Sequence, residues 1–407
     1  MKELDANKER LIANPLFALS LGSRELFHTN FLAWLLESYP EMIASLTSSS
    51  LAREFEVHRE KYNFDLLIVF KDGGSPSSLV VEVKVKDTPR IEQLERYDEK
   101  ILANKQILGA SPEKLLLSLT KAPLGIPNSW RVANLEQLAS EIDKASAGCT
   151  FAEDHFTLVR LYRDLCRELN SLVSKIIETD ISSRDFLFAR TGQEATCKYV
   201  DETLEDLRFL ATLEKHRASK LCEEFKRRSK DHCFGRFRPI FKNGFDRKQA
   251  HVGGSIQIPT DRESNFPKLK LEVHLQGKQY RRMLSFDGFK FSNRTEGKDQ
   301  KKIEDFIQAT DGWNWLFGNT HQNGHFCHSG APNGYFTDRK HISTSQQKSK
   351  SLLSYAPVYI YQYTDIGKQS GVPTDEVIDA VIADLKFAAH LLSDETYVLR
   401  FQEWLPD

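Results

Sequence analysis

The sequence lacks the features of membrane-bound and secreted proteins. None of its uninterrupted apolar runs approaches the roughly 18 residues that a membrane-spanning helix needs, and the charged start MKELDANKER does not resemble a signal peptide. The six cysteines are scattered without a C-x-x-C pair, which favours reduced thiols over a disulfide framework. We therefore expect a soluble, cytoplasmic protein with no membrane partner.

Several functional motifs are absent as well. The glycine-bearing turns GGSPSS and HVGGS fit neither G-x-x-x-x-G-K-[ST] nor G-x-G-x-x-G, and no G-x-S-x-G is present. This argues against an ATP site and against a serine hydrolase. The net charge is -1, so a nucleic-acid surface would require local segregation of cations.

The composition predicts a chain of about two or three domains. With 407 residues, of which 40% are hydrophobic and 28% charged, it can form well-packed cores. Residues 1–148 mix strand and helix patterns, residues 149–230 repeat apolar positions at helical spacing, and residues 231–407 hold short alternating runs before a last helix. We expect an α/β domain, a helical connector and a β-rich α+β domain that ends in a helix.

The most informative stretch runs from Phe64 to Tyr97. Its segments FDLLIVF and LVVEVKVK are rich in β-branched and aromatic residues and are separated by KDGGSPSS, which predicts a hairpin. Alternation along the second strand defines two faces: Leu79, Val81, Val83 and Val85 on one, and Val80, Glu82, Lys84 and Lys86 on the other. Pairing in the hairpin can bring Asp65 beside Glu82. Two carboxylates about 4 Å apart repel by roughly 4 kcal/mol at an effective dielectric constant near 20, and a divalent cation would relieve that repulsion.

Two carboxylates and a lysine on a rigid strand suit Mg²⁺, which is commonly held by one or two carboxylates together with substrate phosphate oxygens. Such an ion lowers the pKa of its water and neutralises charge on a phosphate, and a nearby ammonium can assist. The pattern around Asp65, Glu82 and Lys84 therefore indicates phosphodiester hydrolysis. The competing interpretation is a solvated strand face, because E-V-K is common in amphipathic strands.

The elements around the hairpin occur in the order helix, three strands, helix, strand. The flanking elements are expected at Glu25–Glu37, Glu54–Arg59, Pro89–Leu108 and Lys114–Thr120. This order, with Asp65 and E-V-K in the hairpin, resembles the PD-(D/E)XK nuclease superfamily over the first third of the chain. The resemblance implies a restriction-endonuclease-like α/β core (αβββαβ) with a mixed sheet.

The resemblance also assigns roles to residues of the hairpin. Asp65 and Glu82 match the acidic metal ligands and Lys84 matches the lysine that positions or activates water. The backbone carbonyl of Val83 would be a further metal ligand. The first motif is preceded by Asn63 and contains no proline, a departure that is frequent in the superfamily.

Three residues on the flanking helices complete the expected site. Gln93 and Tyr97 lie one turn apart on the helix after the lysine strand. They match the Gln and Tyr of some subfamilies: Gln93 would orient a water or a phosphate, and Tyr97 would contact nucleic acid. Glu25 opens E-x-x-H-x-x-F-L-A-W-L-L and would assist the metal site.

The resemblance implies Mg²⁺-dependent cleavage of nucleic acid, with DNA as the expected substrate and Mn²⁺ able to substitute. By family analogy alone, it also implies a bacterial protein acting against foreign DNA, and pairing into a homodimer. Two alternatives stay open. The first is a nuclease-fold protein that binds nucleic acid without turnover, and the second is a C-terminal domain that senses a ligand or a protein and gates the nuclease.

Cations and aromatic residues alternate between residues 225 and 248. The cations include Arg236, Arg238 and Lys242, and the interleaved phenylalanines allow a groove that tracks phosphates and stacks on bases. The alternative is a helix end and a strand with solvated cations outside and phenylalanines in the core.

One cluster of zinc-competent residues lies in HQNGHFCH: His321, His325, Cys327 and His328. Its spacing matches no zinc-finger pattern, and the competing interpretation is a turn between strands.

Overall fold

The computed structural model describes fourteen stretches of the chain: residues 2–47, 54–71, 76–85, 87, 89–109, 111–119, 126–180, 195–246, 249–258, 268–277, 279–287, 358–365, 374–396 and 398–399. These form two compact units. Unit 1 comprises Met1–Ser182 and Val200–His216, and unit 2 comprises Ser183–Tyr199 and Arg217–Asp407. The stretch expected as a helical connector is divided between them.

Unit 1 contains a five-stranded mixed sheet in the order β1-β2-β3-β4-β5. The strands are β1 (Phe55–Arg59), β2 (Leu66–Phe70), β3 (Ser77–Lys84), β4 (Glu113–Ser118) and β5 (Arg131–Asn134). The first three strands pair antiparallel, whereas β4 and β5 continue parallel to β3. Helices α4 (Ile91–Ala103) and α5 (Lys105–Leu108) supply the crossover that parallel β3 and β4 require. Unit 1 is thus an α/β fold, and its elements follow the order expected from the sequence.

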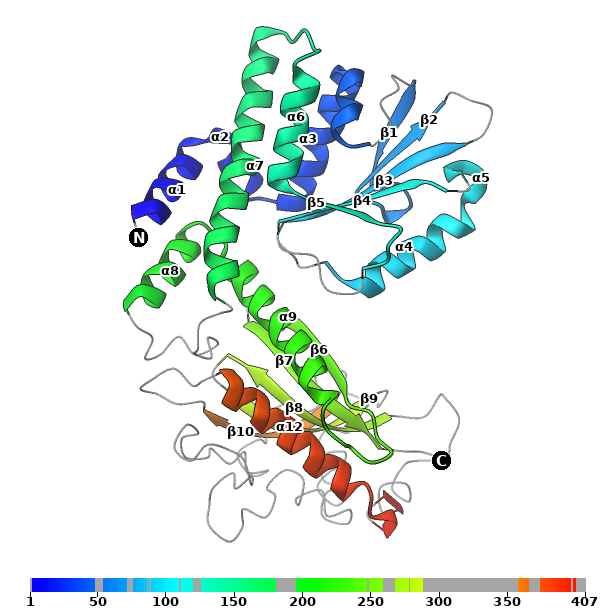
Figure 1. The fold of residues 1–407 in the computed structure, drawn as a ribbon, viewed down its shortest axis with the longest axis vertical. Helices are drawn as coiled ribbons and strands as arrows, with labels where there is room; N and C mark the ends of the chain where they lie inside the picture. Colours follow the sequence, from blue (N-terminus) through cyan, green and yellow to red (C-terminus); the bar gives the residue numbers. More distant parts are fainter. Residues whose placement is uncertain are drawn as a thin grey trace, which may run out of the picture. The chain divides into compact units, whose positions relative to one another are not determined.

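The two faces of β3 enter two different hydrophobic cores. Leu79, Val81, Val83 and Val85 pack with residues of α3, α6 and α7, as their alternation predicts. Val80 packs on the opposite side with Leu94 and Ile101 of α4. Figure 1 shows α4 on one side of the sheet and α3, α6 and α7 on the other. The bounds of these three helices are α3 Arg24–Ser38, α6 Leu135–Ser146 and α7 Glu153–Asp180.

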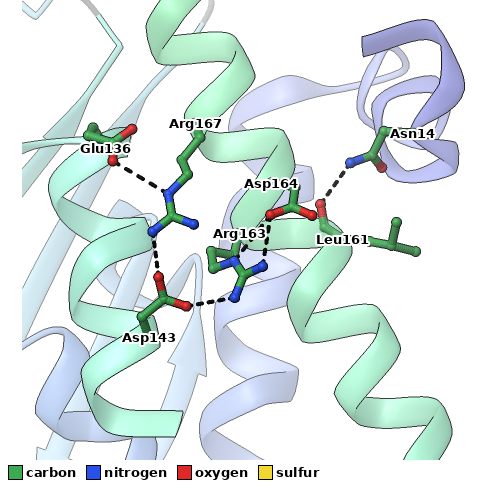
Figure 2. A network of polar contacts seen from close by, with 7 residues as sticks. All are labelled: Asn14, Glu136, Asp143, Leu161, Arg163, Asp164 and Arg167. Carbon is green, nitrogen blue, oxygen red and sulfur yellow. Dashed lines mark hydrogen bonds and ion pairs between the residues drawn. The ribbon is translucent and has the colours of Figure 1, made fainter. Parts of the chain in front are cut away.

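Helix α7 is also tied to its neighbours by polar contacts. Asp143 of α6 accepts a hydrogen bond from Arg163 Nη1 at 2.7 Å and a second from Arg167 Nη2 (Figure 2). Asn14, between α1 (Lys2–Ala13) and α2 (Pro15–Ser20), donates to the Leu161 carbonyl at 2.8 Å. Its side-chain oxygen caps α2 by accepting from the backbone N–H of Leu16.

Unit 2 contains an antiparallel five-stranded sheet in the order β10-β9-β8-β7-β6. The strands are β6 (Ile240–Asp246), β7 (Gln249–Gln257), β8 (Lys268–Gln276), β9 (Gln279–Asp287) and β10 (Val358–Asp365). One face packs on α12 (Thr374–Leu391) and on the C-terminal part of α9 (Leu210–Ser229), through residues such as Phe225 and Leu385. This arrangement is the β-rich α+β fold expected for the C-terminal part of the chain.

A fully buried ion pair lies between the unit 2 sheet and α12. Arg282 donates from Nε and Nη2 to the two carboxylate oxygens of Asp384, both at 2.9 Å. Tyr280 donates its hydroxyl to the same carboxylate at 2.8 Å. Both charged side chains are 0% exposed, so the charges depend on each other for compensation.

None of the helices within the described residues is both long and apolar enough to cross a membrane.

Candidate active site

The β2–β3 hairpin brings the two expected carboxylates together. Leu66 is paired with Val81, so the next position along the hairpin places Asp65 opposite Glu82. Directly opposed side chains of antiparallel strands lie on the same face. Asp65 Oδ2 also accepts the backbone N–H of Val83 at 2.8 Å, so this side chain takes the place of a strand partner where the hairpin pairing ends.

Glu82 is a buried carboxylate, with a side chain only 1% exposed. Its Oε1 accepts hydrogen bonds from Lys84 Nζ at 2.5 Å and from Gln93 Nε2 at 2.6 Å. Its Oε2 is buried without a hydrogen-bond partner among the described residues. Burial, together with the charge of Asp65, raises the pKa of Glu82 to about 7 in spite of the opposing effect of Lys84. The free oxygen leaves room for a further electrophilic partner.

Lys84 is held as a cation. Burial lowers its pKa, but the carboxylates of Glu82, Asp65 and Glu25 outweigh that effect, so its pKa is raised from the ordinary value. A lysine with a raised pKa stays protonated at neutral pH. It can donate hydrogen bonds to a phosphate oxygen or a water, whereas removing a proton from water would require the neutral amine.

Two residues of α4 support Glu82 from the same helix face. Gln93 Nε2 donates to the Tyr97 hydroxyl at 3.0 Å as well as to Glu82. The ring of Tyr97 is buried and meets the Phe64 ring edge to face, with centroids 5.1 Å apart. The structure therefore places Tyr97 inside the site and not on an outer surface. Burial and the charge of Glu82 raise the pKa of Tyr97, so it remains a neutral donor and acceptor.

Glu25 lies in the first turn of α3 and contacts the backbone that follows β3. Its Oε1 accepts the N–H of Val85 at 3.3 Å and the N–H of Asp87 at 3.1 Å. The carboxylate is also close enough to Lys84 to raise the pKa of that lysine. Glu25 thus belongs to the same cluster as Asp65, Glu82, Lys84 and Gln93, and its hydrogen bonds hold Val85 and Asp87 in the turn after β3.

The turn that leads into Asp65 has a backbone that the sequence pattern did not indicate. Glu60, Tyr62 and Asn63 adopt left-handed φ angles of 55°, 59° and 60°. Each such non-glycine residue costs about 1–3 kcal/mol, and strain of this kind is concentrated at functional sites. Lys100 of α4 donates to the Tyr62 carbonyl at 3.4 Å and so helps to hold the turn. Only Asn63 carried a sequence signal, because Asn tolerates the left-handed region.

The donor set fits a hard divalent cation. No cluster of three or more His, Cys, Asp or Glu side chains suited to a metal is found within the described stretches. Asp65 and Glu82 provide two opposed carboxylates, and Oε2 of Glu82, without a hydrogen-bond partner among the described residues, can accept a cation. Mg²⁺ commonly binds through one or two carboxylates, with waters and phosphate oxygens completing its shell, so the residues present are sufficient.

The cation-rich segment of unit 2 separates its charges from its aromatic rings. Arg236, Arg238 and Lys242 are exposed, whereas Phe237 and Phe241 are buried in the core. Buried rings cannot stack on bases. The burial pattern therefore agrees with the alternative of solvated cations over core phenylalanines, and it leaves exposed positive charge as the feature available to a nucleic acid.

The zinc-competent residues His321, His325, Cys327 and His328 lie outside the described residues.

Comparisons of the chain with protein-family models, curated proteins and solved structures find no match in any of the three. The geometry around Glu82 is consequently the feature of the molecule that indicates a function.

Proposed function

We propose that unit 1 is a metal-dependent nuclease that hydrolyses phosphodiester bonds of nucleic acid, with DNA as the expected substrate. The observation that carries this proposal is the environment of Glu82. Its buried carboxylate faces a second carboxylate, contacts a lysine and keeps one oxygen without a partner. A buried carboxylate of this kind is unfavourable for folding, and its raised pKa and charged neighbours are typical of functional sites.

Each residue of the cluster has a role in this proposal. Asp65, Glu82 and the carbonyl of Val83 would hold Mg²⁺ or Mn²⁺. When bound, the ion would supply a water of lowered pKa and neutralise charge on the phosphate. Lys84 would donate hydrogen bonds to the phosphate oxygens as negative charge develops on them. Gln93 would keep Glu82 oriented through its hydrogen bond of 2.6 Å.

The topology around the cluster supports the same proposal. The order α3, β1, β2, β3, α4, β4 has the acidic residue before β2, the glutamate and lysine within β3, and Gln93 on the helix that follows. These are the positions that the resemblance to PD-(D/E)XK nucleases implies. We therefore propose a restriction-endonuclease-like core for unit 1, and defence against foreign DNA as the biological setting by analogy.

The test is cleavage of supercoiled plasmid and of labelled single strands with Mg²⁺, Mn²⁺ or EDTA. We expect metal-dependent cutting that is lost in Asp65→Asn, which removes a metal ligand. In Lys84→Met we expect kcat to fall by about 10²–10³-fold, the size seen when one donor to a developing charge is removed. The matched control is Lys114→Met. Lys114 lies on the neighbouring strand β4 and pairs with Asp98 at 2.7 Å, and its side chain is as little exposed as that of Lys84.

Activity that persists in EDTA, or that is retained in Asp65→Asn, would overturn the proposal. A folded wild type that binds the strands without cutting them would replace it by the non-catalytic alternative. Calorimetric titration of Mn²⁺ gives a second readout, since Asp65→Asn should weaken binding even where cleavage is slow.

A further inference from the structure

The turn after β3 is contacted by a residue far along the chain. Lys215 of α9 donates from Nζ to Asp87 Oδ1, and the two residues are separated by 128 positions. Both belong to unit 1. The lysine side chain is 16% exposed and that of Asp87 is 52% exposed, so the pair lies at the rim of the site.

The start of α9 is firmly anchored in unit 1. Leu210 and Leu213 are buried in the same core as Val83 of β3 and Val85, which follows the strand. Because these leucines lie within two turns of Lys215, its backbone position is fixed by core packing. The lysine is therefore presented to Asp87 by a rigid element.

A second contact ties the residues before α9 to the start of α3. The buried guanidinium of Arg24 donates to the carbonyls of Leu207 at 3.1 Å and Arg208 at 2.7 Å. It also lies 3.4 Å from the centroid of the Phe209 ring. Arg24 is the neighbour of Glu25, so one short segment of chain holds the helix that carries Glu25.

These contacts form a closed chain of interactions around the end of β3. Residues 207–209 hold Arg24, Glu25 accepts the N–H groups of Val85 and Asp87, and Asp87 accepts Lys215. The segment 207–215 is therefore linked to the end of β3 that carries Lys84 in two ways, through Arg24 and Glu25 and through Asp87. This segment lies outside the stretch that the sequence pattern associates with the site.

We propose that Lys215 is a positioning residue of the nuclease site: through Asp87 it fixes the turn that Glu25 holds, and thereby the direction of Lys84. The inference rests on the proposed nuclease function. A half-exposed ion pair adds little to stability, typically about 0–1 kcal/mol. Its effect is expected in geometry, because displacing a catalytic group by about 1 Å can reduce a rate about 10²-fold.

The test compares Lys215→Met, Lys215→Arg and Asp87→Asn in the full chain. Its matched control is Lys220→Met, which removes an α9 lysine that pairs with Glu223 at 3.2 Å. We expect kcat to fall about 10-fold or more in Lys215→Met and Asp87→Asn with KM and Tm unchanged, Lys215→Arg to restore most of kcat, and the control to match the wild type. Amide hydrogen exchange at Val85 and Asp87, measured without DNA, should accelerate about 10-fold in Lys215→Met.

The outcomes separate this inference from the proposed function. A wild type that cuts DNA, with unchanged kcat and exchange in Lys215→Met, would overturn the positioning role and leave the nuclease intact. An increase in KM alone would also overturn it, because it would indicate direct contact with the substrate. A wild type that does not cut, with faster exchange in Lys215→Met, would overturn the nuclease and retain the brace on the turn.

Discussion

The carboxyl group of Glu82 couples the stability of the metal-free protein to pH. Its pKa is raised from 4.5 to about 7 by burial and by Asp65. Between these two values the folded state binds more protons than the unfolded state, so the free energy of unfolding falls as pH rises through that window. A shift of this size corresponds to a loss of about 3 kcal/mol at neutral pH. We predict that urea unfolding in EDTA will show this fall for the wild type and a smaller fall for Glu82→Gln.

The exposed Glu60→Gln variant serves as the control for this experiment and should follow the wild type. Equal pH slopes for the wild type and Glu82→Gln would mean that Glu82 is not protonated in the folded state at acidic pH. Deprotonation of Glu82 should also make metal binding stronger as pH rises toward and above about 7, because the carboxylate must lose its proton to bind a cation.

Removing one partner of the buried pair Arg282–Asp384 should lower the free energy of unfolding far more than replacing both partners by apolar residues. Arg282→Met leaves the Asp384 carboxylate buried without the arginine charge that compensates it, and we predict a loss of about 3–5 kcal/mol in the free energy of unfolding. The double variant Arg282→Met/Asp384→Leu removes both charges and should recover most of that loss. Urea unfolding of the single and double variants measures the difference, and an additive double variant would contradict the argument.

Helix α7 is held to unit 1 by its apolar face more than by its ion pairs. Asp143 accepts two arginines of α7, but its side chain is 37% exposed and water screens the interaction (Figure 2). Tyr162 is fully buried, stacks on Phe31 with ring centroids 3.9 Å apart and hydrogen-bonds His28 at 3.0 Å. We predict a loss below about 1 kcal/mol for Asp143→Ala and about 3–5 kcal/mol for Tyr162→Ala, measured by chemical unfolding. Equal losses of the free energy of unfolding in the two variants would mean that the ion pairs of Asp143 hold α7 as strongly as its apolar face does.

Local sequence patterns predicted the strands and helices of the site because neighbouring residues determine both strand alternation and hairpin pairing. The alternation of β3 places Val81 and Val83 in one core and Val80 in the other, as expected, since strand side chains point to opposite faces. Pairing across a short hairpin then fixes Asp65 opposite Glu82. Both facts follow from about thirty consecutive residues and need no knowledge of distant contacts.

The remaining features depend on residues far apart in the sequence. Lys215 reaches Asp87 across 128 positions and Arg24 reaches the Leu207 carbonyl across 183. No periodicity indicates which turn a distant helix will contact. The aromatic residues between Phe225 and Phe241 illustrate a different limit, because the same alternation of cations and rings fits a stacking surface and a buried core, and only burial separates the two.

At the scale of the whole molecule, the core of unit 1 includes residues well beyond the nuclease-like pattern. The members of this core after residue 148 share nearly complete burial: Val159, Tyr162, Leu165, Cys166, Leu169, Leu172, Val173, Leu204, Leu207, Phe209, Leu210 and Leu213. Each large apolar side chain of this kind contributes about 1.5–3 kcal/mol when buried.

Fragments of the chain should therefore differ sharply in their ability to fold. We predict that residues 1–148 alone will not unfold cooperatively, since the apolar surfaces of α6, α1 and α2 that pack on α7 would be left open to water. Residues 1–216, which retain α7 and the start of α9, should unfold cooperatively and keep Lys215 beside Asp87. Circular dichroism with urea and heat distinguishes the two. Leu165→Ala in the fragment 1–216 is the internal control, and we expect it to lower the free energy of unfolding by about 2–5 kcal/mol. A cooperative fragment 1–148 would show that the strand and helix pattern of the first third is sufficient for the fold, and that α7 is an addition to a core complete without it.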